Sequence, residues 1–445
     1  MSKKLSFRKL TKEFLPISMS DCVMALGDPL VALVLATLPG GTMNLAAFGV
    51  AKGIAVFFES PIIMVLHASN ALSKNRRSHE VLRNFSILLG VLLSLGLLLA
   101  GLSFNYLSSL GLGAGLSDQG REAVGYLTLI MVPWPLLIAL RRHVQGKLIA
   151  LGKSSLVAKG SFLRLLATAS LLLGSCVFTD KGYLVAGLSM IGGLIVEWSF
   201  ITLKGRNCTL ASDDQGEEGL SYPKNLLQMT SYYFPLAWTM VSLWGCRLGL
   251  TLILASSDEM TVAIWASGWA LVVSMANGVR MLQQIVIRHD NPADRQIVGR
   301  FIWAVGVAFT LIFLFIGLHP FGYQIIYRYA GYEVLLSKSV QNMVLWFFLL
   351  PMLMAWQNAL QGSLMTQGKT KILGNISIVC NTGLLFLMLL ILDLNMVSVM
   401  WATIMIITAS CIEVLALVWA VAKKVPHGVL PLSRCLDLNE QEMGV

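Results

Sequence analysis

The sequence reads PLLIALRRHVQGKLIALGKS at residues 135–154 and PMLMAWQNALQGSLMTQGKT at residues 351–370. The two stretches share a leading proline, an alanine, a Gln-Gly pair, a leucine and a Gly-Lys pair, and every shared position has the same offset of 216 in the numbering. Further matches near the start of each half of the chain have an offset of 219. One internal duplication accounts for both offsets. The second set pairs Pro16, Ala36, Thr42 and Gly49 with Pro235, Ala255, Thr261 and Gly268.

The whole chain is apolar enough to lie in a membrane. Hydrophobic residues make up 56% of its 445 positions and charged residues 13%, whereas a soluble domain carries about 25% charged residues. A helix needs roughly 20 mainly apolar residues to cross a bilayer, and the sequence contains twelve such stretches. It therefore predicts an all-α integral membrane protein. The predicted spans are residues 13–38, 43–72, 84–106, 122–148, 156–178, 184–203, 226–255, 260–287, 299–318, 337–364, 372–392 and 397–422.

The duplication sets the arrangement of these spans. Each repeat contains six of them, and an even number keeps both repeats in the same orientation across the membrane. The sequence thus predicts two six-helix lobes related by a pseudo-twofold axis along the membrane normal, with a cavity between them. An acidic stretch with Gly and Ser is expected to link the lobes in the cytoplasm. The predicted organisation is a basic N-terminus at 1–12, the first lobe at 13–204, the linker at 205–223, the second lobe at 224–422 and a cytoplasmic tail at 423–445.

The net charge of +10 follows from where the basic residues fall between the spans. If the N-terminus is cytoplasmic, most of the 33 Lys and Arg residues lie in inner segments. Arg121, Lys181, Arg328 and Lys338 fall in outer loops. This is the positive-inside pattern of membrane proteins. We therefore expect both termini in the cytoplasm and a multi-pass location in the lipid bilayer of a plasma or inner membrane, with no nucleic acid as a partner.

Other functional classes find little support in the sequence. The Gly-Lys-Ser at 152–154 and the Gly-Lys-Thr at 368–370 lack the spacing of a phosphate-binding loop and follow no predicted strand. The six histidines show no ligand spacing, and the seven cysteines are scattered without a CxxC pair. No Ser/His/Asp cluster suggests catalysis. We expect no enzyme activity, no metal site and no cofactor.

Ionisable side chains inside the predicted spans are the candidates for function, because a charge in hydrocarbon is costly. Four of them fall near the middle of their spans, where a side chain cannot extend to the interface. We predict that these four, Asp28, Lys52, Glu59 and Arg247, line the cavity. A structural role is expected for the bases nearer the cytoplasmic ends of their spans. These are Arg141, Arg142, Lys147 and Lys159.

The duplication relates two of the four candidates. Residues 28 and 247 are separated by the offset of 219, so Asp28 and Arg247 place opposite charges at equivalent points of the first and seventh spans. We expect the two side chains to approach each other or to share a water network in the empty protein. A charged substrate would then compete for Arg247. The alternative is a structural ion pair that holds the lobes together.

Further candidates complete the expected cavity. Arg280 in the eighth span would add a cation, and Trp356 and Asn358 in the tenth span would add polar edges. Asp21, Asp28 and Glu413 are intramembrane acids that could exchange a proton or a sodium ion during transport.

Two six-helix lobes with a proline early in the first and seventh helices resemble the multidrug and toxin extrusion (MATE) transporters and the wider lipid and polysaccharide flippase superfamily. Within it, residues 45–51 and the following Phe-Phe-Glu-Ser-Pro at 57–61 resemble the second helix of the progressive ankylosis protein family. Asp28 and Arg247, each twelve residues after a proline, fit the same family, as does the Ser-Lys-Asn-Arg loop at 73–76. Lys52 departs from it, because the family has an aromatic residue there.

The resemblance implies a transporter of anions of the citrate, nucleotide or pyrophosphate class. Bases outnumber acids within the spans, which also favours an anion. The expected function is therefore export of a small organic or phosphorylated anion by alternating access, with a coupling ion as a further option. The alternatives are a proton- or sodium-coupled multidrug or cation antiporter and a lipid-linked oligosaccharide flippase.

Overall fold

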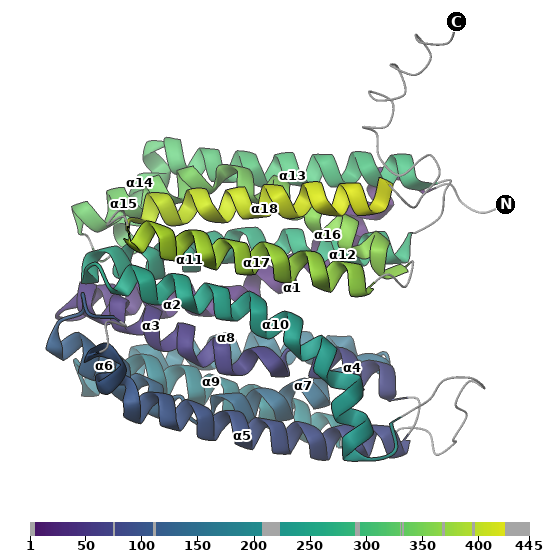
Figure 1. The fold of residues 1–445 in the computed structure, drawn as a ribbon, viewed down its shortest axis with the longest axis horizontal. Coiled ribbons are helices and arrows are strands. Elements are labelled where there is room, and N and C mark those ends of the chain that lie inside the picture. The colour runs from purple at the N-terminus through teal and green to yellow at the C-terminus, as the bar shows by residue number, and fades with distance from the viewer. Residues whose placement is uncertain are drawn as a thin grey trace, which may run out of the picture.

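A computed structural model describes residues 5–73, 76–109, 113–206, 223–289, 294–329, 331, 333–366, 370–393 and 397–422. In these ranges the protein is an elongated bundle of helices, and no strand occurs among them (Figure 1). The first described helix begins and the last one ends at the same end of the bundle (Figure 1). The predicted linker at 205–223 and tail at 423–445 lie almost wholly outside the described residues.

The described helices correspond to the predicted spans. Eleven of them are long and apolar enough to cross a membrane, and the number is twelve if one bent pair of helices is counted as a single span. The pair is α6 (Asp118–Ile130) and α7 (Trp134–Ala150), which meet at 40°. Pro133 and Pro135 lie at the bend, where a missing N–H interrupts the helical hydrogen bonds. The prediction of an all-α membrane fold is confirmed.

Two groups of helices lie side by side along the bundle (Figure 1). The group from the first half of the chain is called the first lobe, and the group from the second half is called the second lobe. The first lobe contains α2 (Gly27–Thr37), α3 (Gly41–Glu59), η1 (Ser60–Ile62), α4 (Val65–Leu72), α5 (Arg76–Ser109), α6, α7, α8 (Ser154–Phe178) and α9 (Gly182–Gly205). The second lobe contains α11 (Glu259–Ala276), η2 (Asn277–Met281), α12 (Leu282–Arg288), α13 (Arg295–Leu318), α14 (Pro320–Tyr329), α15 (Val334–Trp346), η4 (Phe347–Leu349), α16 (Leu350–Thr366), α17 (Thr370–Asp393) and α18 (Val399–Ala422).

The first span is interrupted in its middle. Helix α1 (Phe7–Ala25) and helix α2 are separated by the single residue Leu26. Pro29 favours this break, because it has no N–H to donate to the carbonyl of Ala25. The break places Asp28 in the first turn of α2.

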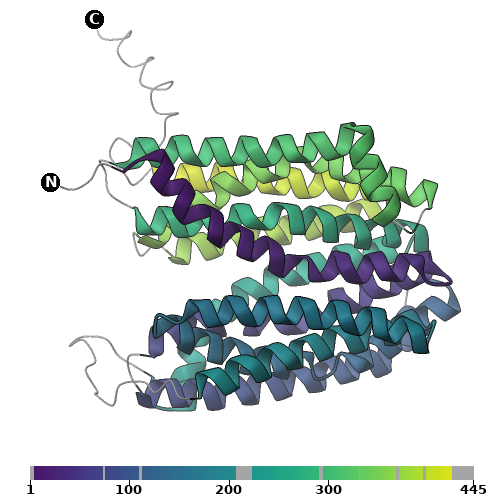
Figure 2. The same cartoon turned by 180° about the vertical axis from the view of Figure 1, so that it is seen from behind.

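The first and seventh spans each cross between the lobes. Helix α1 packs mainly against η2, α11, α12 and α13 of the second lobe, whereas α2 packs against α3 and α8 of the first lobe and also against α11 of the second (Figure 2). Helix α10 (Leu226–Ala255) packs against η1 and α5 of the first lobe and against α17 of the second. Near its start, the Tyr233 hydroxyl donates a hydrogen bond of 2.5 Å to the carbonyl of Pro61. Each lobe thus holds the start of the other lobe's first span.

The lobes meet along α3 and α11 through small residues. A Cβ built on Gly49 of α3 would lie 2.6 Å from the Cβ of Ala266 of α11. This spacing leaves room for glycine alone, and it brings the two helix backbones close together. One apolar core continues across this contact, from Val31 and Leu45 on one side to Val262 and Trp265 on the other.

Candidate functional site

Lys52 is the centre of a polar cluster in the first lobe. Its Nζ lies 3.1 Å from Oδ1 of Asp28 and 4.4 Å from the ring centroid of Trp134. The indole Nε1 of Trp134 donates a hydrogen bond of 2.7 Å to Glu59. Lys52 and Glu59, which share one face of α3, therefore meet at the same aromatic side chain. Three of the predicted site residues, Asp28, Lys52 and Glu59, are brought together in this way.

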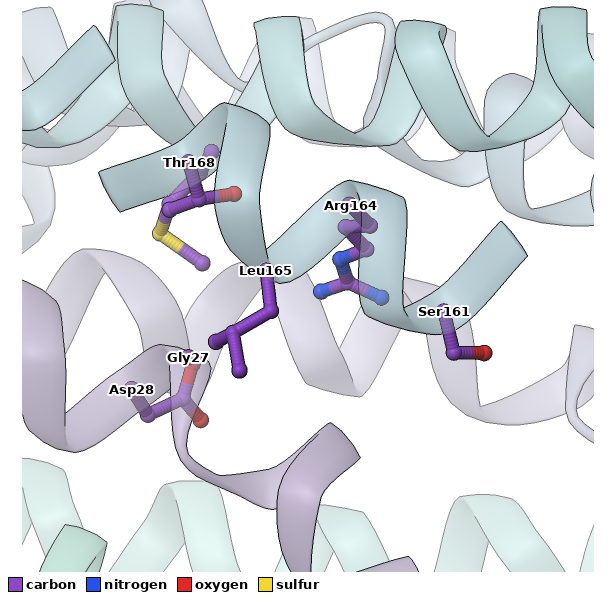
Figure 3. Close-up of a pocket in the computed structure, with 7 residues that line it drawn as sticks. Gly27, Asp28, Ser161, Arg164, Leu165 and Thr168 are labelled. Carbon is purple, nitrogen blue, oxygen red and sulfur yellow. The ribbon is translucent and has the colours of Figure 1, made fainter. Parts of the chain in front are cut away.

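A small pocket opens beside this cluster, between α2, α8 and α9 (Figure 3). Asp28 and Arg164 lie on its facing helices, with Ser161 and Thr168 on the α8 side. The guanidinium of Arg164 is also 5.6 Å from the Trp134 ring centroid. Lys52 and Arg164 thus share one aromatic partner, and Asp28 is 41% exposed. This carboxylate is the accessible member of the cluster.

Glu197 of α9 is completely buried, and both oxygens of its carboxylate have hydrogen-bond partners. Its carboxylate lies 2.7 Å from Nη1 of Arg141 and 3.7 Å from Nη1 of Arg164. Gln145 and Ser161 each donate a hydrogen bond of 3.1 Å to its other oxygen. Removing a buried carboxylate from water is costly unless such partners compensate. This group therefore ties α7, α8 and α9 together.

Arg247 has a different environment in the second lobe. Its guanidinium carbon lies 4.8 Å from the ring centroid of Trp269, which stacks on Trp265 and contacts Phe347. Its Nη1 is buried and has no hydrogen-bond partner within the described ranges. The described residues also give Arg247 no ion pair within 4.0 Å. The aromatic side chains of Trp269, Trp265 and Phe347 thus support this cation, while its Nη1 remains available for a hydrogen bond.

The structure places Asp28 beside Lys52 and Arg247 over Trp269, so it does not show the expected direct approach of Asp28 to Arg247, and a shared water network stays a prediction. Asp28, in the first turn of α2, pairs with Lys52 of α3 instead. The stack on Trp269 occupies one face of the Arg247 guanidinium. Equivalent positions in the sequence repeat do not fix the direction in which each side chain points.

Glu413 of α18 repeats the position of Glu197. Its carboxylate accepts a hydrogen bond of 2.8 Å from Ser377, just as Glu197 accepts one from Ser161, and both members of the pair recur at the offset of 216. The arginines do not recur. The residues equivalent to Arg141 and Arg164 are Gln357 and Cys380. Glu413 is 8% exposed, and the described residues place no Lys, Arg or His within 4.0 Å of it. Arg247 nevertheless interacts with it electrostatically at longer range.

Asp21 and Arg280 lie at the contact between α1 and η2. Asn277 donates from its side chain to the backbone carbonyl of Asp21 at 3.2 Å and accepts from Arg280 at 3.2 Å. Oδ2 of Asp21 is buried without a partner in the described part of the chain, and Arg280 and Arg142 are the cations that act on it electrostatically. This group lies where α1 joins the second lobe.

Two predicted residues of the tenth span take part in packing. Trp356 meets Trp303 edge to face at a centroid distance of 5.5 Å, in the contact between α16 and α13. Asn358 donates to the carbonyl of Met354 on its own helix at 2.8 Å. Neither contact reaches the clusters around Lys52 or Arg247. In the described residues, no three His, Cys, Asp or Glu side chains gather as a metal site would require.

Neither a protein-family model nor a curated protein matches this sequence. Solved structures do match it over nearly its whole length. An inward-facing multidrug resistance MATE family transporter of the MOP superfamily aligns with 92% of this chain and 99% of its own, at 14% identity and a TM-score of 0.66. The fold is that of the MATE transporters. The expected two-lobe MATE-like architecture is thereby confirmed.

Other proteins with the MATE fold are described as performing different tasks. The lipid II flippase MurJ, in an inward closed conformation, matches 93% of this chain and 88% of its own at 16% identity and a TM-score of 0.66. A MOP superfamily transporter from Pyrococcus furiosus with a binding pocket of reverse polarity matches 95% of this chain and 100% of its own, at 14% identity and a TM-score of 0.61. The fold alone does not select among such functions, so the site residues must.

Proposed function

We propose that this protein is an alternating-access transporter that exports a small organic or phosphorylated anion of the citrate, nucleotide or pyrophosphate class. The substrate passes through a central cavity between the two lobes. The observation that carries this proposal is the buried Nη1 of Arg247, which has no hydrogen-bond partner among the described residues and lies close to the middle of the span Ala237–Ala255. The resemblance to the progressive ankylosis protein family supports the same substrate class.

An anion would satisfy Arg247 better than any neutral substrate. A buried N–H without a partner loses its hydration and gains nothing in return, at a cost of about 1–3 kcal/mol. A carboxylate or phosphate restores that interaction with a charge-assisted, often bidentate, hydrogen bond. Trp269 holds the guanidinium in place before the anion arrives, so little side-chain order has to be created on binding.

The Asp28–Lys52 pair offers the anion a second point of contact. Lys52 has an exchangeable partner, because Asp28 is 41% exposed while Lys52 is 16% exposed. An incoming anion could replace the Asp28 carboxylate on Lys52, in the same way as one ion-pair partner replaces another. Glu59 is already occupied by Trp134, so it shapes the site without competing for Lys52. In this proposal, Asp28 keeps Lys52 paired while the protein is empty.

Export of an anion fits the energetics of a cell with a negative interior. The membrane potential contributes about 2.3 kcal/mol per charge per 100 mV. This driving force acts outward on an anion, and a multivalent anion gains it several times over. The transporter can therefore work without a coupling cation.

If an ion is coupled to transport, Glu413 is the best placed of the three candidate acids. Asp28 is neutralised by Lys52, and Asp21 lies at the junction of α1 with η2. Glu413 has the buried position and the serine partner of Glu197, but Gln357 and Cys380 stand at the positions equivalent to the two arginines. A carboxylate in this environment can take up a proton or a sodium ion and so change the charge that Arg247 experiences.

Reconstituted liposomes test the proposal and its alternatives. Vesicles are loaded with radiolabelled citrate, a nucleotide or pyrophosphate, and efflux is measured with an imposed membrane potential. Efflux of an anion that depends on Arg247 supports the proposal. Efflux of a cationic dye alone, driven by a proton or sodium gradient, would replace it with the antiporter. Movement of a lipid-linked oligosaccharide between leaflets, without efflux of soluble anions, would replace it with the flippase.

A further inference from the structure

The lobes also meet at the end of the bundle away from the termini, which is called the far end and is predicted to face outward. Gly115, in the turn before α6, donates a backbone hydrogen bond of 3.1 Å to the carbonyl of Ala255 at the end of α10. Two residues later, both the backbone N–H and the hydroxyl of Ser117 donate to the carboxylate of Glu259, with a distance of 2.7 Å for the backbone N–H. A first-lobe turn is thereby fastened to the second half of the chain.

A second contact at the far end runs in the opposite direction. Gly331, in the turn before α15 of the second lobe, lies directly against the carbonyl of Ala36 at the end of α2. Two residues later, Glu333 accepts a hydrogen bond of 3.3 Å from the hydroxyl of Thr42 in the first turn of α3. A second-lobe turn is thereby fastened to the first lobe.

The internal duplication makes these two contacts copies of each other. Gly331 stands at the offset of 216 from Gly115, and Ala255 stands at the offset of 219 from Ala36, which are the two offsets of the repeat. Each lobe therefore places the same glycine on the end of the other lobe's first span. Glu333 is likewise the repeat position of Ser117. The second half of the chain supplies the carboxylate of both hydrogen bonds.

Both glycines are required by the close approach of the two backbones. A Cβ on Gly115 would lie 2.5 Å from the carbonyl carbon of Ser257, and a Cβ on Gly331 would overlap the carbonyl oxygen of Ala36. Gly331 also has a φ of 65°, a conformation that side chains other than glycine rarely adopt. Any larger residue at either place would push the lobes apart.

The two carboxylates hold this end with bonds that can break reversibly. Glu259 caps the start of α6 from the other lobe, where the backbone N–H groups and the helix dipole favour a negative charge. Hydrogen bonds to a charged group are stronger than neutral ones but remain exchangeable with water. No covalent link or extended salt-bridge network joins these turns in the described residues.

We infer that the two copies of this contact form a twofold lock that keeps the far end closed, and that opening the far end requires both copies to release. This inference rests on the alternating-access part of the proposed function. The lock consists of the Gly115–Ala255 and Gly331–Ala36 contacts with their hydrogen bonds Ser117–Glu259 and Thr42–Glu333. Because each copy joins different helices, the copies contribute independently to closure.

Distances between spin labels at the far end test the lock. The labels are placed on Gln119→Cys of α6 and Lys338→Cys of α15, which are both exposed, after the seven native cysteines have been replaced. The empty protein in nanodiscs should give one short distance. Glu259→Gln and Glu333→Gln should each raise the ratio of open to closed protein about tenfold, and the double variant about a hundredfold, since tenfold corresponds to about 1.4 kcal/mol.

If the closed state is much more stable than the open one, a tenfold change in their ratio would be too small to detect. Larger substitutions at the two glycines are therefore needed. Gly115→Leu and Gly331→Leu insert a side chain directly between the lobes and should produce a long distance. Gly174→Leu is the matched control, because a Cβ on Gly174 meets nothing within 4 Å. An unchanged short distance in both the double carboxylate variant and the leucine variants would overturn the inference, as would equal opening by the control.

The readout separates this inference from the substrate proposal, because the labelled protein is measured without substrate. Opening of the variants together with absent anion efflux would retain the lock and reject the substrate. Anion efflux together with a far end that never opens in these variants would retain the substrate and reject the lock.

Discussion

The hydroxyl of Ser377 donates a hydrogen bond of 2.8 Å to the carboxylate of Glu413. The same bond joins Ser161 to Glu197 in the other lobe, at 3.1 Å. Duplication has thus preserved a serine and a glutamate, while Gln357 and Cys380 replace the two arginines that neutralise the first carboxylate. The two acids should therefore respond differently to the same substitution.

Glu197→Gln should strongly destabilise the protein. The change leaves Arg141 buried without its counter-charge, and breaking a buried pair from one side costs about 3–5 kcal/mol. The measurement is thermal unfolding in detergent, followed by tryptophan fluorescence. Glu413→Gln is the matched comparison, because it removes a carboxylate that the described residues leave without a cation, and its cost should stay within about 1 kcal/mol. Equal losses of stability in the two variants would contradict the distinction.

Arg247→Gln should weaken anion transport while the fold stays intact. The lost charge-assisted hydrogen bond corresponds to about 1.5–3 kcal/mol, which is roughly a 10–150-fold increase in the KM for efflux. Arg247→Lys should retain part of the activity, because it keeps the charge but not the planar fork. Arg288→Gln serves as the control, since Arg288 is 60% exposed and lies 3.8 Å from Glu13 near the termini. Full transport by Arg247→Gln would reject the assigned role.

Asp28→Asn and Lys52→Gln should show energetic coupling in a double-mutant cycle. The pair is separated by 3.1 Å but is partly exposed, so the coupling in stability should be about 1 kcal/mol. Transport should respond in opposite directions: Asp28→Asn frees Lys52 and should lower the KM for the anion, whereas Lys52→Gln should raise it. A lower KM for both variants would show that Lys52 does not bind the substrate.

Gly49→Ala should disturb the contact between α3 and α11. Its new methyl would lie 2.6 Å from the Cβ of Ala266, and such overpacking typically costs about 1–3 kcal/mol. Adding Ala266→Gly should restore the unfolding temperature, because it removes the opposing methyl. Gly53→Ala on the same helix is the control, since its Cβ would have an ordinary separation of 3.5 Å from Leu248. Failure of the double variant to recover would place the cause outside this contact.

Hydropathy and the internal repeat predicted the fold well, because both can be read from the order of residues along the chain without knowing how the helices pack. The predicted seventh span, 226–255, coincides with α10 (Leu226–Ala255), and the predicted fourth span, 122–148, falls within the bent pair of α6 and α7. The break at Leu26 was not predicted, although Gly27 and Pro29 beside it were visible signals.

The side-chain partnerships were harder to predict from the sequence. Asp28, Lys52 and Trp134 come from three separate helices, and their meeting depends on how each helix is rotated about its axis. The cluster around Glu197 was missed for the same reason, since Arg141, Gln145 and Ser161 come from two other helices. The matching serines of the repeat, Ser161 and Ser377, were the available signal. Their shared role becomes clear only when the glutamates beside them are compared.

The crossing of α1 into the second lobe has a consequence for the time course of synthesis. Its contact from Asp21 to Asn277 joins residues that are 256 positions apart. At about 5–20 residues per second, the ribosome needs roughly 13–51 seconds to make the intervening chain. During that interval α1 lacks its native partners in the second lobe. Helix α1 therefore completes its native contacts only after the chain from η2 to α13 has been made, and any chaperone or insertase that shields α1 acts in this interval.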